Sequence, residues 1–504
     1  MTSSTIDHVN RPPRPLARVS LSFVGIAVFC LIVGDVEIST LDPWGEMARM
    51  VKGVFTPDFF ATEHLGGAIL NTLSFAFIGV VLGSACGFAL SLIFRYPAVR
   101  FFCAFIRAVH ELFWALIFLQ AFGLTPITGI LAIAIPFAGA FAKVYSEIIE
   151  EADASPLKTI PKGSGYVSTL FYARIPDIWT HFKTYTMYRM ECGLRSSAVL
   201  GFVGLPTIGF HLETAFSNGN YSEVSALLYL FFIIIASMRL WMRPRLLPAY
   251  LLGAFIVLPV GADISMTNVT RFLTQDIIPG PLRWVNTIDG NALDSLGHWA
   301  WNLLYREALP GVVNTVLLTM IALVGAGILT LVFFPLISKK FFGRRRRAVG
   351  HIFLVVVRST PEYILAYVFL QLWGPSMLPA IVALSLHNGA IIGHLIGRYA
   401  DELPLRPDAP KGMNLYTYNI VPRVYGQFMA FLFYRWEVIM RETAILGILG
   451  IKTLGFYVDS AFTDIRFDRA LALIIITALL NIAVDHISRI VRARLRLKTN
   501  PDIV

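Results

Sequence analysis

Of the 504 residues in this chain, 56% are hydrophobic and only 15% are charged. A soluble globular protein carries about a quarter charged residues, so the composition excludes an ordinary soluble fold and indicates an all-α polytopic membrane protein. The formal net charge of +10 requires no nucleic-acid partner, because the basic residues gather at the ends of apolar segments and set orientation there. The four cysteines lie in apolar segments without metal-like spacing, and we interpret them as packing residues.

Apolar segments that are candidates for spanning helices recur along the whole chain. In the first half they lie near 19–34, 67–94, 101–122, 128–146, 183–204 and 224–239. In the second half they lie near 246–262, 311–338, 351–373, 377–398, 427–450 and 468–490. The segments 35–66 and 263–310 fall outside this pattern.

The connectors between these segments alternate in charge. Basic residues gather at 95–100, 239–245 and 339–347 and in the C-terminal tail, whereas 35–66 is mainly acidic. Basic connectors stay in the cytoplasm, so the pattern predicts twelve spans with both termini inside. Each half then holds six spans, an even number, so the two halves have the same orientation and form a parallel repeat.

Several polar motifs occur twice, about 250 residues apart. The paired motifs are Arg107-x-x-x-Glu111 with Arg358-x-x-x-Glu362, and Glu191-x-x-x-Arg195 with Glu437-x-x-x-Arg441. A set of glycines follows each second motif: Gly201, Gly204 and Gly209, then Gly447, Gly450 and Gly455. We interpret the chain as a tandem duplication with a first repeat over 1–245 and a second over 246–504.

Charged residues inside membrane segments are costly and usually functional. Because positions i and i+4 share a helix face, each arginine is expected to pair with its glutamate within one helix. Two roles stay open: structural ion pairs, or an anion path or gate in which planar guanidinium groups bind oxyanions. The candidates for this path or gate are Arg107, Glu111, Glu191, Arg195, Arg358, Glu362, Glu437 and Arg441.

The apolar segments also contain His110, His387, His394 and His486. None has a partner at ligand spacing, so we interpret them as packing or hydrogen-bonding residues and predict no metal site.

Each half contains one long cytoplasmic connector between its fourth and fifth spans, at 147–182 and 399–426. Both include a Pro-Lys-Gly tripeptide, and acidic residues precede it in both. A long loop in a compact membrane protein is usually functional, although a plain linker is the alternative. We predict coupling loops, with candidate residues Glu150, Glu151, Lys162, Gly163, Asp401, Glu402, Lys411 and Gly412.

These features resemble the permease subunits of ATP-binding-cassette (ABC) importers. Gly163 precedes Pro176 at the spacing of that family's docking loop, although the Glu-Ala-Ala part of the family pattern is degenerate here. The segment Arg-Ala-Val-His-Glu-Leu from Arg107 resembles phosphonate-transporter permeases in particular. So does Tyr-Arg-Met-Glu-Cys-Gly-Leu-Arg-Ser-Ser-Ala-Val-Leu-Gly-Phe-Val-Gly from Tyr188. The resemblance covers 67–240 well and 311–490 more loosely, and the chain departs from the family by fusing two halves.

The resemblance implies the type I ABC importer permease fold in a bacterial inner membrane. It implies transport of phosphonate or a related phosphorus oxyanion, such as phosphite, hypophosphite or phosphate. The implied partners are two copies of an ATPase subunit and a periplasmic or lipid-anchored substrate-binding protein. No Gly-x-x-x-x-Gly-Lys-Ser/Thr sequence occurs, so we expect no enzymatic activity and no cofactor in this chain, with ATP and Mg²⁺ on the ATPase.

Three alternatives remain at this stage. An ABC importer for another small solute would show the same features. A secondary transporter of the major-facilitator type would have its long cytoplasmic loop between the halves, whereas the long loops here lie within each half. An ion channel is disfavoured because no filter-like loop is repeated.

Overall fold

The computed structural model describes residues 14–40, 42–152, 165–258, 263–283, 290–495 and 497, and within these ranges the chain is helical without strands. The chain divides into two compact units. The first-repeat unit comprises Ala48–Leu296 and Ile465–Leu479. The second-repeat unit comprises Met1–Met47, Gly297–Asp464 and Leu480–Val504. The all-α membrane fold expected from the sequence is confirmed.

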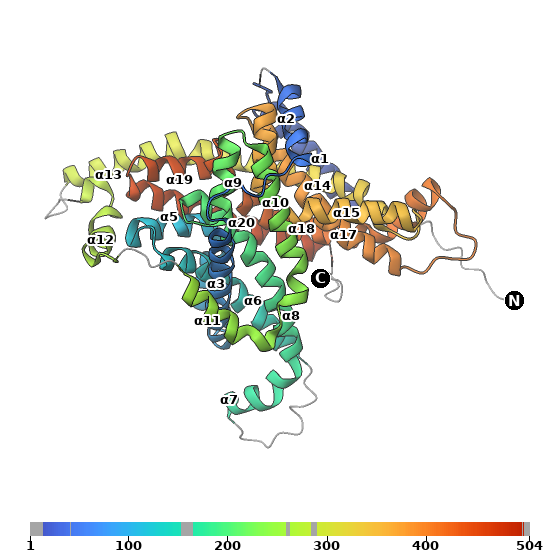
Figure 1. Ribbon diagram of the computed structural model, residues 1–504, viewed down its shortest axis with the longest axis horizontal. Helices are drawn as coiled ribbons and strands as arrows, with labels where there is room; N and C mark the ends of the chain where they lie inside the picture. The colour runs from blue at the N-terminus through green and yellow to red at the C-terminus, as the bar shows by residue number, and fades with distance from the viewer. Residues whose placement is uncertain are drawn as a thin grey trace. The chain divides into compact units, whose positions relative to one another are not determined.

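In the first-repeat unit, α3 packs along α6, and α4, α5, α8 and α11 surround this pair (Figure 1). The helices from Ala48 onward are α2(Pro43–Phe55), α3(Leu65–Leu92), α4(Pro97–Ala108), α5(Glu111–Phe122), α6(Pro126–Glu151), α7(Tyr166–Thr169), α8(Ile175–Val199), α9(Ile208–Ser217), α10(Tyr221–Trp241), α11(Leu247–Val257), α12(Met266–Arg271) and the part of α13(Gly290–Leu303) up to Leu296. Short π- and 3-10 segments join several of them, including η2(Leu170–Arg174) and η3(Leu200–Val203).

In the second-repeat unit, α14 packs along α17, and α1, α15, α16, α18 and α19 contact one or both of them. The helices are α1(Arg14–Val33), α14(Leu309–Ile337), α15(Arg344–Ser359), α16(Glu362–Trp373), α17(Met377–Glu402), α18(Val421–Ile448) and α19(Leu454–Thr463), with the π-helical turn η8(Leu415–Ile420) before α18. Helix α20(Phe467–Arg494) belongs to this unit only from Leu480 onward, and its first part belongs to the first-repeat unit.

Several helices recur in the same order and at similar lengths in the two repeats. Helices α5 and α16 have 12 residues each, α6 and α17 have 26 each, and α9 and α19 have 10 each. The helix that opens each set is also similar in length, at 28 residues for α3 and 29 for α14. Equal lengths in equal order support the duplication, while its boundary near residue 245 stays a prediction.

Small residues allow the central helix pair of each unit to pack closely. In the first repeat the glycines are on α3, where a Cβ at Gly87 would lie 2.4 Å from Cβ of Phe141 on α6. In the second repeat a Cβ at Gly397 of α17 would lie 2.4 Å from Cγ1 of Ile337 on α14, and one at Gly325 of α14 would lie 2.4 Å from Oγ of Ser385 on α17. In a membrane, lipid tails are as apolar as the helix side chains, so the hydrophobic effect does not drive helices together. Close van der Waals contacts at small residues stabilise their association instead.

Each compact unit includes one helix that the predicted boundary at residue 245 assigns to the opposite repeat. Helix α1 lies on α14, and the Phe23 ring meets Phe433 of α18 with centroids 5.2 Å apart. Helix α11 lies on α3, where Tyr250 stacks on Phe77 at 5.5 Å. The compact units are therefore not identical to the sequence repeats.

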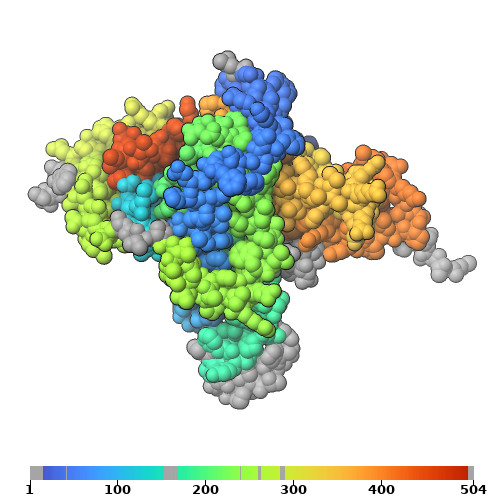
Figure 2. All heavy atoms as spheres, in the orientation of Figure 1, coloured from blue at the N-terminus to red at the C-terminus, as the bar shows by residue number. Residues whose placement is uncertain are grey.

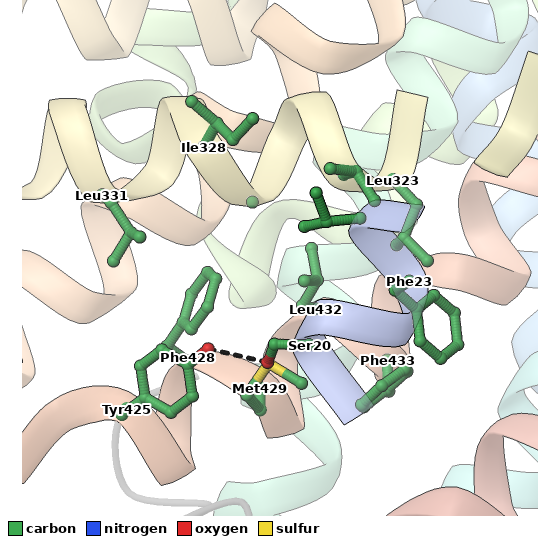
Figure 3. Close-up of a pocket in the computed structure, with 13 residues that line it drawn as sticks. Ser20, Phe23, Leu323, Ile328, Leu331, Tyr425, Phe428, Met429, Leu432 and Phe433 are labelled. Carbon is green, nitrogen blue, oxygen red and sulfur yellow. Dashed lines mark hydrogen bonds between the residues drawn. The ribbon is translucent and has the colours of Figure 1, made fainter. Parts of the chain in front are cut away.

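An apolar cavity of about 110 Å³ lies between α1, α14 and α18 (Figure 3). Its polar contact is the Tyr425 hydroxyl, which donates to Ser20 Oγ at 2.7 Å. Phenylalanine and leucine side chains form most of the remaining wall, so the cavity suits only apolar groups.

Two of the expected spans are not single helices. The segment 101–122 breaks between α4 and α5 with an 88° bend, and 351–373 breaks between α15 and α16 with a 93° bend. At the first break Val109 and His110 are extended, and the His110 side chain accepts from Leu112 N at 3.2 Å. The prediction of continuous helices was wrong. The apolar pattern continues through the break, so it does not reveal where one helix ends and a side chain caps the next.

Among the described residues, seven helices are long and apolar enough to cross a membrane, or up to ten if each bent pair counts as one span. Helix α11 is short for a span, with 11 residues. The chain is therefore an integral membrane protein, and the count of twelve stays a prediction.

The repeated glycines form a tight backbone crossing before α9 and α19. A Cβ at Gly209 would lie 1.7 Å from the Ala198 carbonyl oxygen, and one at Gly455 would lie 2.1 Å from that of Ala444. Close by, the Thr72 hydroxyl accepts from Ile208 N at 2.9 Å, and Thr315 does the same for Leu454 N at 3.0 Å. In the first repeat this contact holds the C-terminal part of α8 and the start of α9 against α3. In the second repeat it holds the C-terminal part of α18 and the start of α19 against α14 in the same way.

We predict that Gly209→Val or Gly455→Val destabilises the protein by about 3 kcal/mol or more, because the branched side chain would overlap backbone atoms that cannot move independently. Thermal unfolding of the detergent-solubilised protein measures this. Gly426→Ala is the matched control, since a Cβ there meets nothing within 4 Å. Equal unfolding midpoints for all three variants would contradict this explanation of the glycines.

Candidate functional site

Each helix break places a glutamate at the start of the following helix. Glu111 is the first residue of α5, and Glu362 is the first residue of α16. A carboxylate is favoured there because unpaired N–H groups and the helix dipole make the N-terminus positive. The break therefore positions one acidic group in each repeat.

In the first repeat, a hydroxyl and an imidazole lie beside this glutamate. Ser196 Oγ donates to Glu111 Oε1 at 2.7 Å, which ties α5 to α8. His110 Nε2 lies 3.8 Å from Glu111 Oε2. The neighbouring Arg189 stacks over Phe137 at 5.5 Å, and its Nε donates to the Tyr185 hydroxyl at 2.7 Å.

In the second repeat, the imidazole comes from a different helix. His387 of α17 places Nε2 3.8 Å from Glu362 Oε2, and its side chain is 2% exposed. Its Nδ1 lies 2.9 Å from the Thr360 carbonyl oxygen. Because a carbonyl oxygen only accepts, this contact requires the hydrogen on Nδ1.

A second carboxylate completes the cluster of the second repeat. Glu442 of α18 is 8% exposed and lies 3.5 Å from the Arg435 guanidinium. Asn388 connects the two: its Oδ1 accepts from Arg435 Nε at 2.7 Å, and its Nδ2 donates to Glu442 Oε2 at 3.1 Å. Arg435 thus compensates part of the buried negative charge.

Aligned positions of the two repeats show coordinated replacements. His110 and Pro136 of the first repeat correspond to Pro361 and His387 of the second, so histidine and proline have exchanged places. Phe137 and Ser196 correspond to Asn388 and Glu442. One imidazole lies beside the break glutamate in both repeats, although it comes from a different position. The second repeat adds one carboxylate together with the amide that contacts it.

The structure corrects one expectation about the predicted pairs. Arg107 lies in the last turn of α4 and Glu111 begins α5, so the bend separates them, and Arg358 and Glu362 are separated in the same way. The expectation that each pair shares one helix face is therefore wrong for these two pairs.

The other two predicted pairs do lie within single helices, α8 and α18. These pairs are Glu191 with Arg195 and Glu437 with Arg441. Arg195 Nη2 contacts Cys192 Sγ at 3.7 Å. Their role in a substrate path or gate stays a prediction.

Sequence reasoning did not assign Ser196, His387, Asn388, Arg435 or Glu442 to a site. One feature of the sequence could have pointed to them: Glu442 occupies the position in the second repeat that corresponds to Ser196 in the first. A buried hydroxyl rarely becomes a carboxylate unless charged or polar groups around it change as well.

The predicted coupling residues lie at the ends of α6 and α17. Glu150 and Glu151 close α6, and Asp401 and Glu402 close α17. Asp401 Oδ1 accepts from Ser338 Oγ at 2.6 Å and from Lys339 N at 2.8 Å, so it also fixes the start of the preceding loop.

The Pro-Lys-Gly tripeptides are described only in the second repeat. Lys162 and Gly163 lie outside the described residues. Lys411 and Gly412 are exposed, and Gly412 adopts a φ of +64°, which favours glycine. In the same region, burial lowers the pKa of Lys340, repulsion by Arg423 adds to this, and Asp401 opposes it.

The segment from α7 to the start of α8 extends beyond the ends of α3 and α11 (Figure 1). The space-filling view shows it as a projection from the first-repeat unit (Figure 2). In the second repeat, η8 occupies the corresponding place before α18. Exposed aromatic side chains lie on both segments, Tyr172 in the first and Tyr418 in the second.

Comparison with known proteins shows which proteins the chain is similar to. Residues 332–497 match the family described as binding-protein-dependent transport system inner membrane component. The phosphate-import permease protein PhnE of Mycolicibacterium smegmatis is 25% identical over 492 residues, which cover 91% of each chain. The phosphite transport system permease protein PtxC of Stutzerimonas stutzeri is 27% identical over 230 residues, or 43% of this chain and 82% of that protein. No solved structure matches.

These matches confirm the resemblance to ABC importer permeases. The match to PhnE extends over both repeats of this chain and covers 91% of each protein. A fused chain with two repeats is consistent with this match. The match to PtxC covers 82% of that protein but only 43% of this chain, so PtxC is the shorter protein.

We predict that Arg435→Leu destabilises the protein by about 3–5 kcal/mol, because Glu442 would remain buried without its guanidinium. The double variant Arg435→Leu/Glu442→Gln should recover much of this loss, since no lone charge remains. Thermal unfolding midpoints of the solubilised variants measure both effects. Arg398→Leu, at an exposed position of α17, should change stability by less than about 0.5 kcal/mol. A double variant no more stable than Arg435→Leu would show that the pair is not coupled.

Proposed function

From the permease family match, we propose that this chain is the transmembrane subunit of an ATP-driven importer for phosphonate or a related phosphorus oxyanion. Phosphite, hypophosphite and phosphate belong to the same class of cargo. The observation that carries the proposal is the match over 91% of both chains to a permease named for phosphate import. The second relative, named for phosphite transport, supports the same class.

The proposed complex contains two copies of an ATPase subunit and one substrate-binding protein, which is periplasmic or lipid-anchored. The ATPases would dock on the loops 147–182 and 399–426, and they would hold the ATP and Mg²⁺. The permease would lie in the inner membrane of a bacterium with both termini in the cytoplasm. The basic connectors support this orientation.

The proposed transport cycle uses the duplicated helices α8 and α18. Arg195 and Arg441 occupy equivalent places in these helices, and a guanidinium can bind two oxygens of a phosphorus oxyanion at once. Glu191 and Glu437 would hold the arginines while the path is closed. ATP binding would rock the halves and release the arginines to the anion.

An importer of another small solute is the alternative, because the substrate-binding protein contributes to specificity and lies outside this chain. A major-facilitator transporter is disfavoured by the family match of residues 332–497. Uptake of radiolabelled phosphate, phosphite and methylphosphonate by proteoliposomes with the complete complex separates these possibilities. Uptake of none of the three would contradict the proposal.

We predict that Arg195→Lys or Arg441→Lys lowers anion uptake by about tenfold, because lysine keeps the charge but loses one of two charge-assisted hydrogen bonds. Complex assembly and ATP hydrolysis should persist. The control is Glu191→Gln/Arg195→Gln, which leaves no lone charge in the membrane. If this double variant transports at the wild-type rate, the arginine is structural and does not contact the anion.

We predict that a single cysteine at Asn414, in a background lacking the four native cysteines, is labelled by an impermeant thiol reagent only from the cytoplasmic side. Bound ATPase should protect it, because the loop 399–426 would then be covered. A cysteine at Lys452 is the matched control and should be labelled from outside intact cells. Labelling of Asn414→Cys from outside would overturn the orientation, and unchanged labelling with ATPase bound would overturn the docking assignment.

A further inference from the structure

Three metal-ligand side chains converge in the second-repeat unit, at the break between α15 and α16. One ligand atom each from Glu362, His387 and Glu442 lies within 4.8 Å of the others. The residues come from α16, α17 and α18, and two of them are buried while Glu362 is half-buried. Such a set spans three helices and is shielded from bulk water.

The imidazole of this set presents an acceptor to the carboxylates. Since Nδ1 donates to the Thr360 carbonyl at 2.9 Å, the neutral ring directs the Nε2 lone pair toward Glu362 Oε2 at 3.8 Å. Two carboxylates and an imidazole nitrogen thus converge on one largely buried place, and these are ligand types that transition-metal ions use in proteins. The backbone carbonyl on the second ring nitrogen is also the usual partner of a histidine that binds a metal.

The surrounding groups orient the carboxylate of Glu442. Asn388 donates to Glu442 Oε2 at 3.1 Å, and Arg435 Nε donates to Asn388 Oδ1 at 2.7 Å. The Arg435 guanidinium lies 3.5 Å from Glu442 Oε1. A carboxylate held by hydrogen bonds in this way is typical of a metal ligand with an ordered outer shell.

We propose that Glu362, His387 and Glu442 bind a divalent first-row transition metal ion of the Zn²⁺ or Mn²⁺ class. An imidazole nitrogen with two carboxylate oxygens suits these ions better than Mg²⁺ or Ca²⁺, which prefer oxygen ligands alone. A modest shift of the side chains would bring the three ligand atoms to bonding distance from one ion. The bound ion would tie α16 to α17 and α18 at the break.

The first repeat provides an internal comparison. Pro136 and Ser196 stand where the second repeat has His387 and Glu442, so two of the three ligands are replaced there. The Ser196 hydroxyl donates to Glu111 and satisfies that carboxylate without a cation. The metal site therefore belongs to the second repeat and makes the two halves of the permease chemically unequal.

The proposal is tested with Zn²⁺ on the full-length chain in nanodiscs, after chelation and reloading. Metal analysis after desalting should find about one tightly bound zinc per chain in the wild type. His387→Ala and Glu442→Ser should each lose it, and zinc should raise the thermal unfolding midpoint of the wild type only. Glu442→Ser introduces the residue of the first repeat, so it is expected to fold even if His387→Ala does not.

The matched control is His181→Ala, which removes an exposed histidine of α8 and should leave the zinc content unchanged. Zinc content that is equal in the wild type and in Glu442→Ser would place the ion elsewhere and overturn the proposal. A wild type that binds neither Zn²⁺ nor Mn²⁺ would also overturn it.

Discussion

Each unit is built around two long helices that cross closely, and the other helices of the unit pack against this pair. Helices α3 and α6, or α14 and α17, approach so tightly that a methyl group on their glycines would meet the facing helix at 2.4 Å. In lipid this contact stabilises through dispersion at short range, so its geometry cannot loosen without loss. Gly87 of α3 makes this contact in one repeat, and Gly397 of α17 makes it in the other.

The helix breaks add chemistry to this scaffold. A right-angle bend interrupts each apolar segment and places a glutamate at a helix start, against the helix that carries the second repeated motif. Around these glutamates the repeats have diverged in a coordinated way, with histidine and proline exchanged and serine replaced by glutamate. Duplicated halves in one chain can diverge independently, whereas two copies of a single-half permease would have to stay identical. Fusion thus permits an asymmetric polar site.

Two further helices extend the packing around the central pairs. Helix α1 packs on α14 in the second-repeat unit, and α11 packs on α3 in the first-repeat unit. The Phe23 ring contacts Phe433, and the Tyr250 ring stacks on Phe77. The predicted boundary at residue 245 assigns each of these two helices to the opposite repeat.

The sequence by itself determined the class of the protein, because hydropathy, charge alternation and the repeated motifs are local properties. It predicted the all-α membrane fold, the duplication and the permease family, and most helix ends fall within a few residues of the structure. It did not predict the bends, because Val109 and His110 interrupt hydrogen bonding without interrupting the apolar pattern.

Only the tertiary structure joined His387 to Glu362 and Glu442. These residues are far apart in the chain, and no spacing rule connects them, since their proximity depends on how α16, α17 and α18 pack.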